Sequence, residues 1–232
     1  MGDQYKFYSI AVLGALSVAL FSWSLREGLS RNMTLLTLIL PLFFTLGVGL
    51  FWFLLPRSLF AQVPIVLFYG IGIYALCLTS NIYTVSTIRT IALMRAARGV
   101  GFVLTLITIF LVYDAILSVR INYILTGGLV FLLSFPLFLQ GFWSVVLEES
   151  LQKEVLLVSL ISSMIMGELS LGLYFWPVTV VVGSLFLTVA GYVLLGLGQA
   201  KLEGRLFAQT VREYLILGSV VFLAMFLATY WS

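Results

Sequence analysis

Two acidic residues, Asp114 and Glu168, lie inside long apolar stretches of this 232-residue sequence. A charged side chain near the bilayer centre costs about 2.5–3.5 kcal/mol on insertion scales, so an acid placed there is expected to face the bundle interior or water. A carboxylate that binds a proton or a cation inside the membrane is what ion-coupled transport requires. We therefore predict a candidate intramembrane ionisable site at these two residues.

Three residues are candidate partners of Asp114. Ser118 lies four residues further along the chain, on the same face of a helix, and Arg120 and Arg57 lie in short connections. An Asp–Arg pair that joins a helix to a turn is the structural alternative to an ion-coupling role. For Glu168 the corresponding alternative is a neutral acid that is hydrogen-bonded to a neighbouring helix.

Other kinds of chemistry have few residues to support them. The sequence has no histidine and one cysteine, Cys77, which excludes a Ser-His-Asp triad, a histidine proton relay and most zinc sites. It also lacks the G-x-x-x-x-G-K-[ST], H-E-x-x-H and G-x-S-x-G patterns. We predict no catalytic, cofactor-binding or metal-binding residues, and an enzyme is the less favoured class.

The composition identifies the environment in which these residues act. Hydrophobic residues make up 62% of the chain and charged residues 9%, whereas soluble domains average about 45–50% and 25%. So much apolar surface requires lipid as its solvent. The net charge of +3 is accounted for by loops that face an anionic leaflet, so we expect the lipid bilayer as partner and no nucleic acid.

Eight apolar segments are each close to the roughly 20 residues that a helix needs to cross the hydrocarbon core. We therefore predict an all-α fold, a polytopic transmembrane bundle that forms one integral membrane domain over 1–232 without a soluble domain. The predicted spans are 7–25, 34–55, 60–79, 99–119, 122–146, 155–175, 178–198 and 214–231.

The basic residues predict an orientation, because cytoplasmic loops carry an excess of lysine and arginine. With eight spans, alternate gaps lie on the same side, and nine of the twelve basic residues share one side. These nine are Arg26, Arg31, Arg89, Arg95, Arg98, Lys153, Lys201, Arg205 and Arg212. That side is predicted to be cytoplasmic in a plasma (cell) membrane, with both termini outside.

The 80–98 connection is a candidate cytoplasmic basic surface, because Arg89, Arg95 and Arg98 lie in it. It contains neither glycine nor proline, so it is expected to continue the third helix or to lie on the membrane surface. A simple positive-inside loop is the first interpretation. Binding of an anionic lipid or of a protein partner at the cytoplasmic face is the second.

These observations favour a non-enzymatic membrane protein, either a small-solute transporter coupled to protons or cations, or a membrane-embedded subunit or scaffold of a larger assembly. A transporter should have a polar cavity beside the acids, whereas an assembly subunit should have a packed interior and an exposed contact surface. A lipid-processing enzyme, the less favoured third class, should open laterally beside an acid and a basic residue. The oligomeric state is left open.

Overall fold

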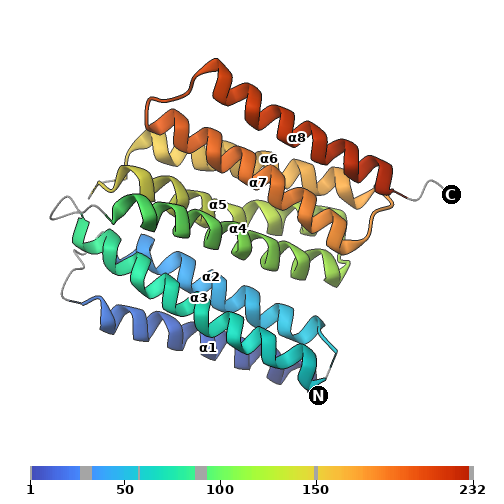
Figure 1. The fold of residues 1–232 in the computed structure, drawn as a ribbon. Coiled ribbons are helices and arrows are strands. Elements are labelled where there is room, and N and C mark those ends of the chain that lie inside the picture. Colours follow the sequence, from blue (N-terminus) through green and yellow to red (C-terminus); the bar gives the residue numbers. More distant parts are fainter. Residues whose placement is uncertain (1, 27–32, 57, 87–92, 149–150, 230–232) are drawn as a thin grey trace. The chain divides into compact units, whose positions relative to one another are not determined.

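A computed structural model of the chain describes residues 2–26, 33–56, 58–86, 93–148 and 151–229. This part of the chain forms eight α-helices and no strands (Figure 1). The helices are α1 (Gly2–Ser24), α2 (Met33–Leu54), α3 (Leu59–Ser86), α4 (Met94–Val119), α5 (Tyr123–Val146), α6 (Lys153–Tyr174), α7 (Val180–Leu202) and α8 (Ala208–Ala228). All eight are long and apolar enough to cross a membrane. The predicted all-α class and number of spans are confirmed.

The predicted spans overlap all eight helices, but α1 and α8 begin five and six residues earlier than predicted and α7 ends four residues later. The third connection differs at both of its ends. There, α3 continues to Ser86 and α4 begins at Met94, so helix occupies both ends of the predicted 80–98 connection. The absence of glycine and proline explains this, because nothing in the sequence stops the helical hydrogen-bonding pattern where the chain leaves the apolar segment. Of the candidate basic surface, Arg89 lies outside the described residues.

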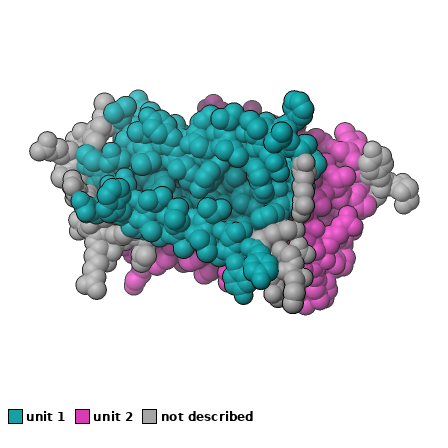
Figure 2. Space-filling model, turned by 90° about the horizontal axis from the view of Figure 1, so that it is seen from below, with its two compact units in different colours: residues 1–112, 147–150 teal, residues 113–146, 151–232 magenta. Residues whose placement is uncertain are grey.

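The chain divides into two compact units, coloured separately in Figure 2. Unit 1 comprises residues 1–112 and 147–150, and unit 2 comprises residues 113–146 and 151–232. The boundary falls within α4, between Val112 and Tyr113. The single membrane domain expected from the sequence stays a prediction.

In unit 1, α2 packs against both α1 and α3. Phe44 on α2 is fully buried and stacks on Tyr69 of α3, with ring centroids 6.0 Å apart. The Phe44 ring also occupies the space that a Cβ on Gly72 would need. A glycine at this position of α3 therefore lets the aromatic ring of α2 pack directly on the α3 backbone.

In unit 2, α5, α6 and α7 pack against one another, and α8 packs on α7 (Figure 1). A Cβ on Gly167 of α6 would lie 3.2 Å from the Gly127 carbonyl oxygen of α5, so these two backbones approach closely. Three serines on α6 with 0% exposure share this buried side, and each donates its hydroxyl hydrogen to a carbonyl of its own helix: Ser159, Ser163 and Ser170. Because these hydroxyls are satisfied locally, the helix can bury them.

The outermost helix, α8, has one residue buried within the described part of the chain, Met225. It is joined to the connection before α7 by Trp176, whose Nε1 donates a hydrogen bond to Thr229 Oγ1 over 2.8 Å. The same indole packs edge-on against the rings of Phe222 and Phe226. One tryptophan therefore holds the carboxyl end of α8 by both polar and aromatic contacts.

Thr229→Val should loosen this end of α8, because valine keeps the shape of threonine but cannot accept the indole hydrogen bond. We expect a loss of about 1 kcal/mol, the usual net contribution of one hydrogen bond. Hydrogen exchange over residues 208–228 should be faster in this variant. Thr105→Val is the matched control, because the Thr105 hydroxyl bonds the Gly101 carbonyl of its own helix. Equal exchange in both variants would show that the indole contact does not hold α8.

Candidate functional site

The candidate site in unit 2 centres on Asp114, near the end of α4. Its side chain is buried, with 4% of its surface exposed. Ser184 on α7, itself fully buried, donates a hydrogen bond from Oγ to Asp114 Oδ1 over 3.1 Å. The bond joins residues 70 positions apart in the sequence. Asp114 therefore connects two helices instead of a helix and its adjoining turn.

The start of α7 lies beside Asp114. Thr179 caps α7, and Gly183 follows in its first turn. A Cβ added to Gly183 would lie 3.4 Å from Leu117 Cδ1 on α4, an ordinary van der Waals contact. Ser184, the next residue, lies within hydrogen-bonding distance of the carboxylate.

The three partners considered from the sequence are placed elsewhere. Ser118 is half-buried and Arg120 is exposed, and neither forms a hydrogen bond or ion pair with Asp114. Arg120 directly follows α4 with a left-handed φ of 49°, a conformation that ends the helix. Arg57 lies outside the described residues. Within the described part of the chain, Asp114 thus has a hydroxyl group as its partner and no cation.

The Ser184 hydroxyl has two acceptors within reach. Its Oγ lies 3.1 Å from Asp114 Oδ1 and 3.0 Å from the Val181 carbonyl oxygen. A hydroxyl carries one hydrogen, so it donates fully to one acceptor at a time. Rotation about one bond would therefore switch Ser184 between the carboxylate and its own helix, and the local structure accepts either arrangement.

A cavity of about 320 Å³ lies at the end of unit 2 where α4 ends and α5 begins. Its polar lining comes from Arg120, Thr126 and Thr179, and Trp176 contributes an indole ring. Arg120 forms no ion pair with any described residue. The cavity therefore offers a free positive charge and hydroxyl groups to a bound molecule.

Asp114 lies next to the inner wall of this cavity. Leu117, which lines the cavity, is three residues from Asp114 on α4, and Gly183, another lining residue, directly precedes Ser184 on α7. Three residues on a helix correspond to about 4.5 Å along its axis. Asp114 and Ser184 therefore lie within one helical turn of residues that line the cavity.

Glu168, the second predicted acid, lies apart from Asp114. It lies on α6 with an exposed side chain, and it forms no hydrogen bond or ion pair with a described residue. It does not line the cavity near Asp114. The two acids therefore do not form one site, and Glu168 lies on the exposed face of α6.

The depth of Glu168 makes this exposure costly. It lies six residues before the end of α6 at Tyr174, which is about 9 Å along the helix axis. The neighbouring exposed side chains on α6 include Ile161 and Met164, so the surroundings are apolar. An acid at the bilayer centre costs about 2.5–3.5 kcal/mol, and Glu168 carries part of this cost unless a partner satisfies it.

Tyr113, the residue before Asp114, belongs to a buried pair of hydroxyl groups. The Tyr113 hydroxyl and Ser134 Oγ lie 2.7 Å apart, and Ser134 also hydrogen-bonds the Val130 carbonyl. Both Tyr113 and Ser134 have 0% exposure. The sequence analysis did not single out Tyr113, Ser134 or Ser184, because isolated hydroxyl residues in apolar helices are common and their partners lie far away in the sequence.

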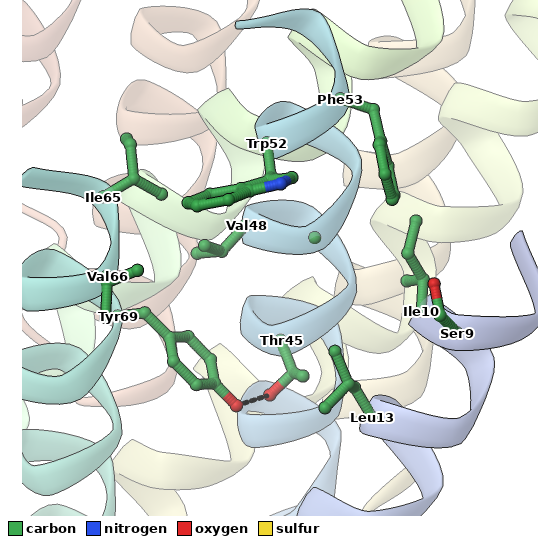
Figure 3. A pocket seen from close by; sticks show the side chains of 11 residues that line it. Ser9, Ile10, Leu13, Thr45, Val48, Trp52, Phe53, Ile65, Val66 and Tyr69 are labelled. Atoms are coloured by element: carbon green, nitrogen blue, oxygen red, sulfur yellow. Dashed lines mark hydrogen bonds between the residues drawn. The ribbon is translucent and has the colours of Figure 1, made fainter. Parts of the chain in front are cut away.

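Unit 1 contains an apolar cavity of about 350 Å³ between α1, α2 and α3. In Figure 3 the Tyr69 hydroxyl points toward Thr45, with 3.2 Å between their oxygens. Thr45 donates to the Pro41 carbonyl over 2.8 Å, so Tyr69 is the donor in the pair. The other labelled lining residues are Ser9, Ile10, Leu13, Val48, Trp52, Phe53, Ile65 and Val66. Among the described residues, the lining has no carboxylate and no basic group.

The candidate basic surface is described in part. Arg95 is exposed and Arg98 is half-buried near the start of α4. The Tyr83 hydroxyl on α3 donates to the Ala97 carbonyl over 3.1 Å, which fixes the start of α4 against the end of α3. Binding of an anionic lipid or protein at this surface stays a prediction. No group of three potential metal-ligating side chains lies together in the described ranges.

Eight apolar helices and a buried acid beside a polar cavity define a polytopic helical membrane protein. The chain belongs to the family described as "Protein of unknown function (DUF5656)", whose model matches residues 4–228. No curated protein and no solved structure matches the chain.

Proposed function

We propose that the protein is a membrane transporter for a small solute, in which Asp114 couples solute movement to a proton or another cation. The observation that supports this proposal is the position of Asp114, buried, without a cationic partner in the described part of the chain, and next to a cavity with polar lining. An acid that served only to stabilise the fold would be expected to have a cation or several hydrogen-bond donors around it.

The Ser184 hydroxyl gives the proposed coupling step a physical basis. When Asp114 is ionised, Ser184 donates to its carboxylate, and when Asp114 takes up a proton, the hydroxyl turns to the Val181 carbonyl. Neither state leaves the hydroxyl hydrogen without an acceptor, so no donor becomes unsatisfied when the proton binds or leaves. The carboxylate can then load and release a proton without reorganising its helices.

The charge distribution orients the proposed transporter. The positive-inside rule places the cavity end of unit 2 outside and the candidate basic surface with Arg95 and Arg98 in the cytoplasm of a plasma membrane. Solute would enter from outside, pass Arg120, and reach Asp114 behind Leu117. Anionic lipid headgroups would lie near the two cytoplasmic arginines.

Transport by the purified protein tests the proposed function. Proteoliposomes containing a pH-sensitive dye should lose an imposed proton gradient faster than protein-free liposomes when the right solute is supplied. Defined pools of amino acids, sugars, organic cations and organic anions serve as probes. A gradient loss that depends on one pool supports coupled transport. The proposed transport would be contradicted if the gradient decays at the same rate with every pool as in protein-free liposomes, for imposed gradients of either direction.

Cysteine labelling tests the access route independently of the solute. In a Cys77→Ser background, Thr179→Cys should react rapidly with a membrane-impermeant thiol reagent added outside cells, because residue 179 is exposed and lines the cavity. Ser184→Cys should react at least tenfold more slowly, because the residue is buried behind the wall. Ser163→Cys, equally buried on α6, is the control and should stay unlabelled. Reaction of Thr179→Cys only from the cytoplasmic side would contradict the proposed orientation.

Glu168 favours the second candidate function, a membrane-embedded subunit of a larger assembly. An exposed acid on an apolar helix surface is a feature of a contact surface and has no role in the cavity described above. Separate substitution of the two acids distinguishes the two functions. Loss of function on changing Asp114 alone supports transport, and loss on changing Glu168 alone supports assembly.

A further inference from the structure

One face of α6 is exposed along most of the helix. Leu157, Ile161, Met164, Glu168 and Gly172 recur at intervals of three or four residues, and all five are exposed. Residues at this spacing lie above one another on a helix and form a continuous stripe. The stripe carries three large apolar side chains, one acid and one glycine.

Gly172 makes the stripe suitable for close contact with another helix. It lies one turn beyond Glu168, and a Cβ added to it would meet no atom within 4 Å. A glycine in open space on a helix surface lets a second backbone approach more closely than a larger residue would. The acid therefore lies next to the part of the helix that a neighbour can approach most closely.

We infer that this face of α6 binds a transmembrane helix of another protein, and that this helix carries a lysine or arginine at the level of Glu168. The negative charge of Glu168 and its lack of a described partner specify the complementary charge. The three apolar residues of the stripe supply the surrounding contact, and Gly172 supplies the close approach. The inferred interface goes beyond the proposed transport site, which uses other residues.

The basic side chains that the structure describes do not supply a matching cation in a second copy. Apart from Arg120, these described side chains lie around the other ends of the helices, at the ends of α1 and α7 or at the starts of α4, α6 and α8. Arg120 follows the last residue of α4 and so lies beyond the helical part of the span. Glu168 lies six residues inside α6.

Energy transfer in phosphatidylcholine vesicles tests this interface with full-length protein. The probe is a synthetic transmembrane helix of leucine and alanine with one lysine. This lysine lies six residues, about 9 Å, inside the end of the peptide that corresponds to the carboxyl end of α6. The comparison peptide has leucine in place of that lysine. The labelled protein should bind the lysine peptide about tenfold more tightly than the leucine peptide, and Glu168→Gln should remove this difference.

Two glycine variants test the geometry of the face. Gly172→Leu should weaken binding of the lysine peptide about fivefold, because its side chain fills the space open to the partner. Gly128→Leu is the matched control and should leave binding unchanged, because Gly128 is also exposed and open but lies on α5. Equal affinity of wild-type protein for both peptides would overturn the inference. Self-association that depends on Glu168 and is unaffected by the lysine peptide would also overturn it, in favour of a second copy.

Discussion

Asp114→Asn is expected to reduce proton-coupled uptake at least tenfold in proteoliposomes while the protein still folds and inserts. Asparagine keeps the size of aspartate and an oxygen that accepts the Ser184 hydrogen bond, but its amide does not take up or release a proton. The substitution therefore removes the ionisable function and preserves the contact between α4 and α7. Uptake rates and thermal unfolding of the purified variant measure the two effects separately.

Serine variants provide the controls for this experiment. Ser184→Ala should lower uptake two- to fivefold, because it removes the donor to Asp114 and leaves the carboxylate. Ser170→Ala should have no effect on uptake, because the Ser170 hydroxyl is equally buried but bonds the Gly167 carbonyl of its own helix. Full uptake by Asp114→Asn would exclude an ionisable role for this residue in transport.

Gly198→Ala is expected to cause the largest loss of stability, about 2 kcal/mol within the range for overpacked cores. A Cβ at this position would overlap the ring of Phe142, which is fully buried on α5 and stacked on Phe138 with centroids 5.7 Å apart. The added Cβ would also lie 3.2 Å from Val158 Cγ1. Because the ring is held by these neighbours, α7 must move outward.

Unfolding in mixed detergent micelles measures this loss. Gly128→Ala is the matched control, since its Cβ would enter open space and alanine has the higher helix propensity. Its stability should equal or slightly exceed that of the wild type. Equal stability of the two variants would show that the contact between α7 and Phe142 is looser than the structure indicates.

The sequence predicts the helices well because each span must satisfy its own backbone in lipid. Length and apolar composition are enough to predict these helices. The prolines do not break them, because Pro41, Pro64 and Pro136 all lie inside continuous helices. The burial of Ser159, Ser163 and Ser170 also follows from their spacing on α6. Such features depend on residues close together in the chain.

Glu168 shows that tertiary packing decides which face of a helix an acid occupies. The cost of a charge in lipid predicts an interior or water-facing position for it. At 100° per residue, however, Glu168 lies about 160° around the helix from Ser170 and about 100° from Gly167, both on the buried side. Packing of the small residues against α5 determines the rotation of α6, and the acid is left on the opposite face.

The sequence alone therefore determines the class and the number of spans, because these depend on rise per residue and local composition. Only the tertiary structure decides the partner of Asp114. Ser184 is 70 residues away, and Arg120 is six residues away and exposed. The bond to Ser184 joins α4 to α7, a contact between distant segments that neither hydropathy nor local spacing contains.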